Sequence, residues 1–368
     1  MSFTTWWSDL GYTCTLVAVR GEGNALPVWA FDVDLVNYHQ RLLERFRMQE
    51  TFSQGYSPLY TAVFGQLAAW LAADSAELDP LVRWLLEAGQ GRQVLDVTLL
   101  VAAGLHKDVL AGAPEVQALA AYFPSIGGNR EPDAAFEMAL REAINGRRES
   151  LTTFIQTANV QTNETGRGLC WLLPLMSMPW KQVCLVDLGA SAGLNLLANK
   201  RAFRLVTEEG GETLLDVGEA SPVQFVTRCR GNLAPLAQYR DGELPEIVGR
   251  FGCDLLPFSL DSVEAERTLM SYVWGDQVAR LERLREGIDA FREVQAGDVP
   301  VQLYRVDLPD ELGGFLRDAV PGNECPVVIY NTFMTAYLSD KGASFRETIG
   351  RWAAGRKQPV LWLQWEPV

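Results

Sequence analysis

Histidine is scarce in this chain, and cysteine occurs only as isolated residues. Two histidines, His39 and His106, stand among 368 residues, and the six cysteines lie far apart with no C-x-x-C pair. Structural zinc sites need cysteine and histidine ligands clustered at short spacings. We therefore expect no essential metal. Most of the cysteines stand inside apolar runs, so we expect buried, reduced thiols.

Positive charge and long apolar runs are also in short supply. Lysine and arginine number 32 against 46 acidic residues, which gives a net charge of −14 and a sequence pI near 4.7. This balance works against binding to nucleic-acid phosphates or to anionic lipid. The first residues, MSFTTWWSDLGY, hold no basic leader before an apolar core, and no run is long enough to span a bilayer. We expect a cytoplasmic protein without nucleic-acid or membrane partners.

With 48% hydrophobic and 21% charged residues, the chain has enough apolar residues to form the cores of two domains, or of one domain with insertions. From residue 34, apolar residues recur at helical spacing, and Ser57 with Pro58 marks a helix start. Further helices are predicted over 78–88, 94–111, 114–121 and 133–157. These patterns predict a mainly α-helical N-terminal domain, residues 1–158. Within it, 12–33 is predicted as a short hairpin around RGEGN or an irregular arm.

The second part of the chain alternates between strand and helix patterns. The stretch 183–197, VCLVDLGASAGLNLL, predicts a buried strand, a tight turn and a helix. Further strands are predicted within 246–258, 301–312, 327–337 and 359–367, with helices over 261–275, 277–294 and 343–354. A β-hairpin insertion is predicted over 202–230. We predict an α/β domain over 159–368 with a doubly wound, mostly parallel, Rossmann-like sheet.

The turn after the first of these strands is the main candidate for a functional site. Its residues Asp187, Gly189, Ala190, Ser191 and Gly193 have three interpretations. As D-x-G-x-x-x-G, the turn lets the backbone approach a nucleotide-like cofactor. As G-x-S-x-G, it places Ser191 on the nucleophile elbow of an α/β-hydrolase, but that fold requires a histidine later in the chain and none follows the turn. A plain strand-to-helix turn is the third interpretation.

Polar residues stand where each predicted strand ends. Asp187, Asp254 and Asp307 end three strands, and Asn331 with Thr332 ends the fourth. In doubly wound sheets, ligands bind beyond the carboxyl ends of the strands. An acid after the second strand can accept both ribose hydroxyls, and one after the third can accept an adenine amino group. Any one of these residues alone also suits ordinary turn chemistry.

Two nucleotide cofactors are candidates for this site. NAD requires the spacing G-x-G-x-x-G and an acid about 20 residues further on. The turn has Gly189, Ser191 and Gly193 instead, and Asp254 stands much further along the chain. S-adenosylmethionine (SAM) or S-adenosylhomocysteine fits better, because SAM carries no pyrophosphate and its positive sulfonium tolerates an acidic pocket.

Seven segments together resemble a bacterial family catalogued as a domain of unknown function. They are SPLY (57–60), YFPSIGG (122–128), VQTNETGR (160–167), DLGASAGLNLL (187–197), GCDLLP (252–257), SYVWGDQ (271–277) and LQWEP (363–367). The resemblance covers nearly the whole chain and implies a SAM-methyltransferase-like Rossmann core behind a helical N-terminal region. In the methyltransferase pattern, Asp187, Gly189, Ser191 and Gly193 match the first motif. Asp254 matches the ribose-binding acid, and Asp307 matches the adenine-side acid.

The sequence therefore predicts a SAM-dependent methyltransferase that acts on a small molecule. Glu164 is the predicted base, with Asn331 and Tyr337 as further catalytic candidates. Candidates to hold the methyl acceptor are Asn163, Arg167 and Thr332. Two alternatives stay open: a non-catalytic protein that binds a nucleoside or another small molecule on the same fold, and a serine hydrolase with Ser191. The sequence leaves the acceptor and the oligomeric state open.

Overall fold

The computed structural model describes residues 4–7, 12–16, 35–73, 78–161, 164–219, 221, 223–230, 236, 239, 242–335, 338, 340 and 342–366. The chain divides into two compact units. The sheet unit comprises 1–29, 164–260 and 283–368, and the helical unit comprises 30–163 and 261–282. Each unit is thus assembled from separated stretches, whereas the sequence predicts a single boundary after residue 158. Residues 261–282 are expected in the α/β domain and lie in the helical unit instead.

The helical unit contains eight α-helices among the described residues, and α10 begins in it. They are α1 (Leu35–Ser53), α2 (Pro58–Ala72), α3 (Pro80–Ala88), α4 (Val94–Ala111), α5 (Gln117–Ala120), α6 (Phe136–Gly146), α7 (Arg148–Thr157) and α9 (Val263–Ser271), with α10 at Val278–Gln295. Two short 3₁₀ helices, η1 (Pro114–Val116) and η2 (Pro124–Ile126), complete it. The predicted cap is confirmed, because the Ser57 side chain accepts a hydrogen bond from the Tyr60 amide and Pro58 opens α2.

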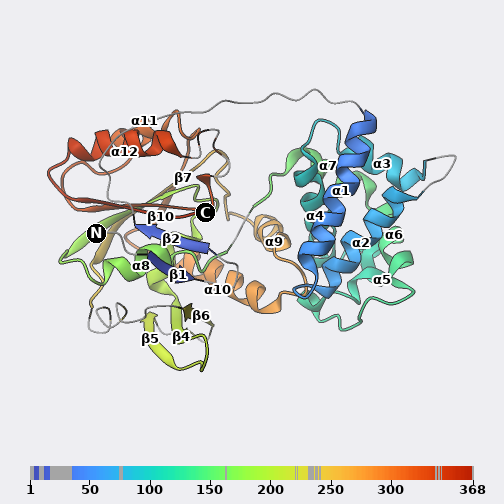
Figure 1. The fold of residues 1–368 in the computed structure, drawn as a ribbon, viewed down its shortest axis with the longest axis horizontal. Coiled ribbons are helices and arrows are strands. Elements are labelled where there is room, and N and C mark those ends of the chain that lie inside the picture. Colours follow the sequence, from blue (N-terminus) through green and yellow to red (C-terminus); the bar gives the residue numbers. More distant parts are fainter. Residues whose placement is uncertain are drawn as a thin grey trace. The chain divides into compact units, whose positions relative to one another are not determined.

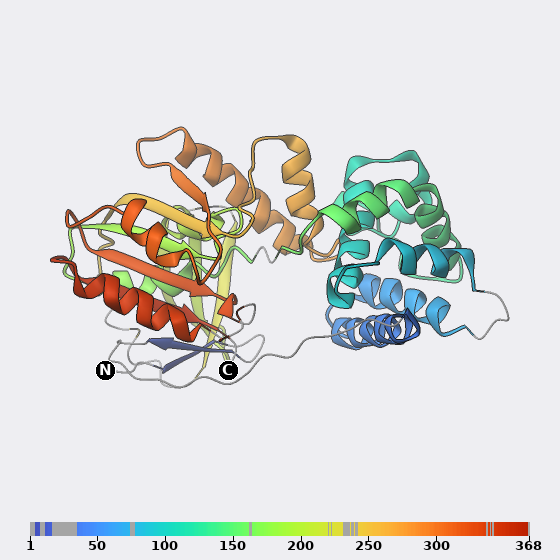
Figure 2. The ribbon, with the colours of Figure 1, turned by 90° about the horizontal axis from the view of Figure 1, so that it is seen from above.

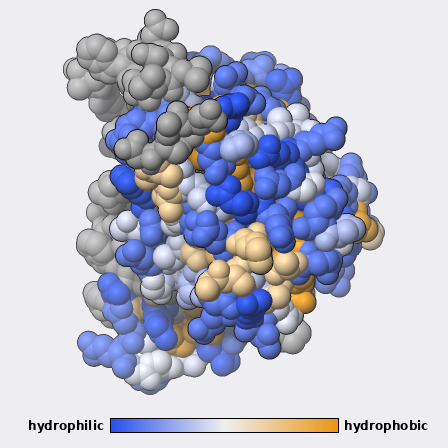
Figure 3. All heavy atoms as spheres, turned by 90° about the vertical axis from the view of Figure 1, so that its right-hand side faces the viewer, coloured by the Kyte–Doolittle hydropathy of each residue, from blue (hydrophilic) through white to orange (hydrophobic). Residues whose placement is uncertain are grey.

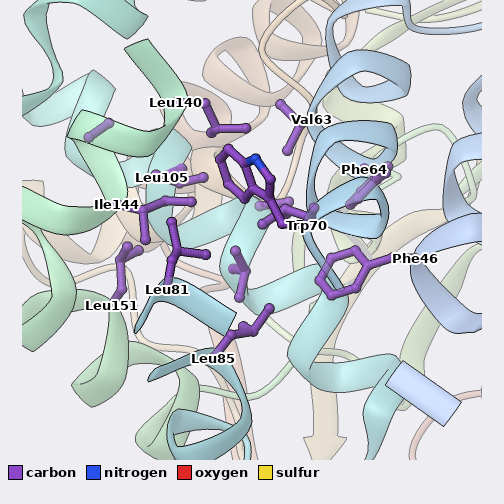
Figure 4. Close-up of a cluster of buried hydrophobic side chains, with 14 of the residues drawn as sticks. Phe46, Val63, Phe64, Trp70, Leu81, Leu85, Leu105, Leu140, Ile144 and Leu151 are labelled. Atoms are coloured by element: carbon purple, nitrogen blue, oxygen red, sulfur yellow. The ribbon is translucent and has the colours of Figure 1, made fainter. Parts of the chain in front are cut away.

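One continuous apolar core holds these helices together. Figure 4 shows part of it, with Trp70, Leu105, Leu140 and Ile144 facing a shared interior from different helices. Each of these helices turns an apolar face inward, so burial of these side chains supplies the main stabilisation of the unit.

Three of the sequence blocks meet inside the helical unit. The Ser57 hydroxyl lies 2.7 Å from both carboxylate oxygens of Asp276, and the Tyr60 ring stacks on Trp274 with centroids 4.9 Å apart. The Ser125 amide donates to the Gly275 carbonyl at 2.8 Å. The blocks SPLY, YFPSIGG and SYVWGDQ therefore fasten the segment 261–282 to helices that precede it by more than 100 residues.

The described residues of the sheet unit form ten strands. These are β1 (Thr4–Trp7), β2 (Tyr12–Leu16), β3 (Gln182–Leu188), β4 (Ala202–Thr207), β5 (Thr213–Gly218), β6 (Gln224–Arg230), β7 (Glu246–Asp254), β8 (Val301–Arg305), β9 (Val327–Thr332) and β10 (Val360–Trp365). Their order is β5-β4-β6-β1-β2-β10-β9-β3-β7-β8. The last five strands in this order pair only in parallel with one another.

The five parallel strands confirm the predicted α/β sheet. Their spatial order places β3 and β9 side by side, with β7 and β8 on one side and β10 on the other, so the strand order reverses between β3 and β9. In Figures 1 and 2, α11 (Leu312–Asp318) and α12 (Ala343–Ala354) cover one face, where their apolar side chains pack on β3 and β9. Helix α8 (Leu169–Leu175) lies on the other face in Figure 1.

One local prediction needs correction, and another is largely untested. The helix predicted after the turn is a 3₁₀ helix, η3 (Leu194–Lys200). In the segment 12–33, Tyr12–Leu16 forms β2, which pairs with β1 and β10, and residues 17–33 lie outside the described part of the chain. The hairpin within 202–230 is confirmed as the antiparallel pair β4 and β5, and both strands belong to the ten-stranded sheet.

Cysteines and the surface agree with the composition. The five cysteines whose side chains are described, Cys170, Cys184, Cys229, Cys253 and Cys325, are buried free thiols, as predicted. Figure 3 shows a predominantly hydrophilic face of the helical unit with small apolar groups on it. No helix within the described ranges is apolar enough over sufficient length to cross a membrane.

Candidate functional site

The turn between β3 and η3 is held by the neighbouring strand β7. The amides of Gly189 and Ala190 both donate to the Cys253 carbonyl, at 2.8 and 2.9 Å. The turn passes through left-handed backbone at Gly189 (φ 84°), Ser191 (φ 50°) and Gly193 (φ 74°). Glycine adopts this conformation without strain, but serine does so at a cost. A strained serine therefore stands at the centre of the turn.

Asp254, the last residue of β7, fixes the middle of this turn. One of its carboxylate oxygens accepts from the Ser191 amide at 2.9 Å, and the other accepts from the Leu256 amide at 3.1 Å. Each carboxylate oxygen has two acceptor positions, so both keep capacity for a further donor. The side chains of Leu255 and Leu256 that follow are about half exposed, at 50% and 45%. The strand end thus combines a carboxylate with an apolar surface.

Asp187 lies buried below the turn, with 3% of its surface exposed. The Tyr330 hydroxyl on β9 donates to its carboxylate at 3.0 Å. Burial raises the pKa of Asp187 to about 7; the Tyr330 hydrogen bond lowers it, the charge of Asp254 raises it and that of Arg167 lowers it. The carboxyl group thus changes charge near neutral pH, directly beneath the candidate site.

The loop after β9 is strained at one residue and held by another. Phe333 has a left-handed backbone (φ 56°), which is a rare conformation for a bulky side chain. Glu366 accepts hydrogen bonds from the Asn331 side-chain amide at 2.6 Å, the Met334 amide at 3.2 Å, and both the amide and hydroxyl of Thr335 at 3.1 and 2.9 Å. The Glu366 carboxylate thus binds residues on both sides of Phe333 and fixes the conformation of the loop.

Residues 164–168 reach the same loop. The Arg167 guanidinium lies 4.1 Å from the centre of the Phe333 ring, in a cation–π contact. The Glu164 carboxylate accepts a hydrogen bond from the Gly166 amide at 3.3 Å. On the other side, a Cβ added at Gly189 would lie 3.0 Å from Met334 Cβ. The turn after β3, the loop after β9 and Arg167 therefore surround one region at the carboxyl edge of the sheet.

The structure brings together some of the predicted site residues and gives others a packing role. Asp187, Gly189, Ala190, Ser191, Asp254 and Arg167 lie around the turn, as described above. Asn331 is engaged at both ends of its amide, since Trp362 Nε1 donates to its oxygen at 2.9 Å and its nitrogen donates to Glu366. Thr332 is buried at the end of β9. The catalytic and acceptor-binding roles of these residues stay predictions.

Gly193 and Asp307 are the two other predicted cofactor residues. A Cβ at Gly193 would lie 2.9 Å from Val301 Cγ1 and 3.1 Å from Leu303 Cδ2, so this glycine permits η3 to pack on β8, and its role in cofactor binding stays a prediction. Asp307 is exposed beyond the end of β8, and the preceding amide, that of Val306, donates to the Asp254 carbonyl. Asn163 and Tyr337 lie outside the described residues.

Sequence reasoning missed Tyr330, Phe333 and Glu366. Tyr330 sits within an apolar strand, VVIYNT, where a buried tyrosine gives no functional signal. Phe333 combines a left-handed backbone with a cation–π contact to Arg167, and the sequence reveals neither. Glu366 stands in the block LQWEP, so an acid at the end of the last predicted strand was the one available signal.

One of three comparisons with known proteins identifies a family for this chain. No curated protein and no solved structure matches this chain. A family profile described as "Uncharacterized protein conserved in bacteria (DUF2332)" matches residues 44–368, which include nearly all of the helical unit and the whole candidate site. The chain therefore belongs to this bacterial family of uncharacterised proteins.

Proposed function

We propose that this protein is a SAM-dependent methyltransferase that acts on a small molecule. The observation that carries the proposal is the Asp254 carboxylate at the end of β7, hydrogen-bonded to the Ser191 amide of the turn after β3. This carboxylate lies one strand from the reversal in strand order, where doubly wound sheets bind nucleotides. The proposal rests on this placement and on the chemistry of the residues around it.

The donor set suits an adenosine with a positively charged sulfur. Asp254 would accept from the ribose hydroxyls with the capacity that the loop amides leave. Leu255 and Leu256 offer an apolar surface for the base, and Asp307 an acceptor for its amino group. The bound SAM would supply a methyl group already activated for transfer.

The remaining work of the protein is to align the acceptor and exclude water. Arg167, held over the Phe333 ring, would orient the acceptor, together with Thr332 and the predicted Asn163. Glu164 would take a proton from the acceptor where one must leave. Asn331, which is bonded to Trp362 and Glu366, would fix the loop geometry. Tyr337 stays a predicted catalytic residue.

Calorimetric titration of the purified protein tests the cofactor. We expect SAM or S-adenosylhomocysteine to bind with micromolar affinity, about −8 kcal/mol. The absence of heat and of a thermal shift at millimolar ligand would refute the cofactor assignment. Incubation of the SAM-bound protein with cell metabolites then separates an enzyme, which forms S-adenosylhomocysteine, from a protein that binds without chemistry.

A serine hydrolase is the second candidate, and the left-handed backbone of Ser191 favours it. Nucleophile elbows hold their serine in a strained turn between a strand and a helix. Both histidines of the chain, however, belong to the helical unit, whereas Ser191 belongs to the sheet unit.

Ser191→Ala distinguishes these two candidates. As a loop residue, Ser191 contributes at most one side-chain hydrogen bond, so we expect methyl-transfer activity within about tenfold of wild type. Loss of a hydrolase nucleophile costs around a millionfold in turnover. We would measure SAM turnover and ester hydrolysis on the same preparations. An esterase activity present in the wild type and absent from Ser191→Ala would identify a hydrolase and refute our proposal.

A further inference from the structure

Arg250 is a buried cation in the middle of β7. Only 4% of its surface is exposed. Its Nη1 donates to the Leu196 carbonyl and, at 3.1 Å, to the Asn199 side-chain oxygen, while its buried Nε has no hydrogen-bond partner among the described residues. None of the described carboxylates forms an ion pair with it. The charge of Glu219, which pairs with Lys200, acts on Arg250 without a direct contact. A buried charge whose hydrogen bonds go to neutral acceptors alone is costly, so this guanidinium retains capacity for an anion.

Arg250 is one of the residues that line a cavity of about 390 Å³ within the sheet unit. The walls combine three kinds of side chain. Ile247, Val294 and Val299 are apolar, Lys200 and Asn199 stand beside Arg250, and Glu293 and Asp298 are acidic. Arg250 is buried, whereas Glu293 and Asp298 are exposed. The positive group is therefore at the floor and the negative groups are at the rim.

The cavity lies away from the candidate cofactor site. Ile247 is the second residue of β7, and the turn at Ser191 is held by Asp254 at the other end of that strand. Lys200 ends η3, which starts directly after Gly193. The cavity and the candidate cofactor site thus use opposite ends of the same two elements.

We propose that this cavity binds a small zwitterion with an aliphatic side chain, such as an α-amino acid. Its carboxylate pairs with the Arg250 guanidinium, and its ammonium group lies between the Glu293 and Asp298 carboxylates. The side chain contacts Ile247, Val294 and Val299. A dianion such as phosphate would satisfy Arg250 but would face the repulsion of both rim carboxylates, so a zwitterion matches this charge pattern better.

Titration of the full-length protein with three probes tests the charge pattern. L-Leucine carries both charges, 4-methylpentanoate lacks the amine, and 3-methylbutylamine lacks the carboxylate. We expect L-leucine to bind with a dissociation constant of about 1 mM or tighter, and the two analogues at least about tenfold more weakly. No heat with L-leucine at about 10 mM, equal binding of either analogue, or tighter binding of inorganic phosphate would overturn the proposal.

Variants locate the binding. Arg250→Met keeps an unbranched apolar stem without the charged guanidinium and is expected to weaken L-leucine binding at least about 30-fold. The double variant Glu293→Gln, Asp298→Asn changes only exposed groups, and it should weaken L-leucine binding while leaving 4-methylpentanoate binding unchanged or improved. If Arg250→Met does not fold, the binding of L-leucine and 4-methylpentanoate to the double variant tests the proposal instead. Asp289→Asn, an exposed change on α10 outside the cavity lining, is the matched control.

SAM itself contains an amino-acid group, so L-leucine binding must be assigned either to the cavity or to the proposed cofactor site. The variant Asp254→Ala makes this distinction. L-Leucine binding that persists in Asp254→Ala and is lost in Arg250→Met supports the cavity. The opposite pattern places L-leucine in the cofactor site and overturns the inference.

Discussion

Asp254→Ala is expected to weaken SAM binding by more than about 100-fold and to abolish methyl transfer. A hydrogen bond to a charged group is worth about 1.5–3 kcal/mol, so loss of two ribose contacts costs at least about 3 kcal/mol. The substitution also releases the Ser191 and Leu256 amides, which the carboxylate holds in the native loop. Calorimetric titration with SAM measures the first effect, and release of S-adenosylhomocysteine measures the second.

Asp318→Ala is the control for this experiment. Asp318 is an exposed acid at the end of α11, paired only with its neighbour Arg317 among the contacts described, so its removal should leave SAM binding unchanged. Circular dichroism shows whether the Asp254 variant remains folded. A folded Asp254→Ala protein that binds SAM as tightly as wild type would show that the cofactor does not lie at this strand end.

Asp187→Asn is expected to make the sheet unit more stable in alkaline solution but not in acid. Burial raises the pKa of Asp187 from 3.8 to about 7. Between these two pH values, the Asp187 carboxyl keeps its proton in the folded protein and loses it in the unfolded chain. The resulting stabilisation is complete below pH 3.8 and is lost as the pH rises to about 7, a change of about 4 kcal/mol in the free energy of unfolding. Asparagine stays neutral throughout and can still accept from Tyr330.

The measurement is urea unfolding of wild type and variant between pH 4 and pH 8. The difference between the two proteins isolates Asp187, because the other titrating groups are common to both. We expect the stability of the variant relative to wild type to increase by about 4 kcal/mol across this range. Asp318→Asn, an exposed change on the same unit, should give a constant difference. Parallel pH profiles for wild type and Asp187→Asn would contradict the raised pKa.

Much of the fold follows from local sequence patterns. The helix predicted over 94–111 is confirmed at both ends, and β7 ends at Asp254 as expected. These elements have strong apolar periodicity and clear boundaries. The assignment of 261–282 to the helical unit was not predictable in this way, because contacts such as Ser57 with Asp276 join residues 219 positions apart.

The candidate site was predictable only in part. Small residues and strand-end acids identified the turn and Asp254, because the carboxyl ends of parallel strands share one edge. The packing of Gly193 against β8 was not predictable, since a glycine in a turn looks the same in the sequence whether it admits a cofactor or a neighbouring strand. The backbone of Phe333 and the four hydrogen bonds to Glu366 depend on tertiary packing that no single segment encodes.

The division of both units into separated stretches imposes an order on biosynthesis. Ser57 leaves the ribosome long before Asp276, and at about 5–20 residues per second the 219 residues between them take roughly 10–40 seconds to translate. During that time, helices α1 to α7 lack the segment that completes their unit. The sheet is completed later still, because β2 pairs with β10. Until β10 has been translated, we expect nascent chains to expose apolar surface and to bind chaperones that act on the ribosome.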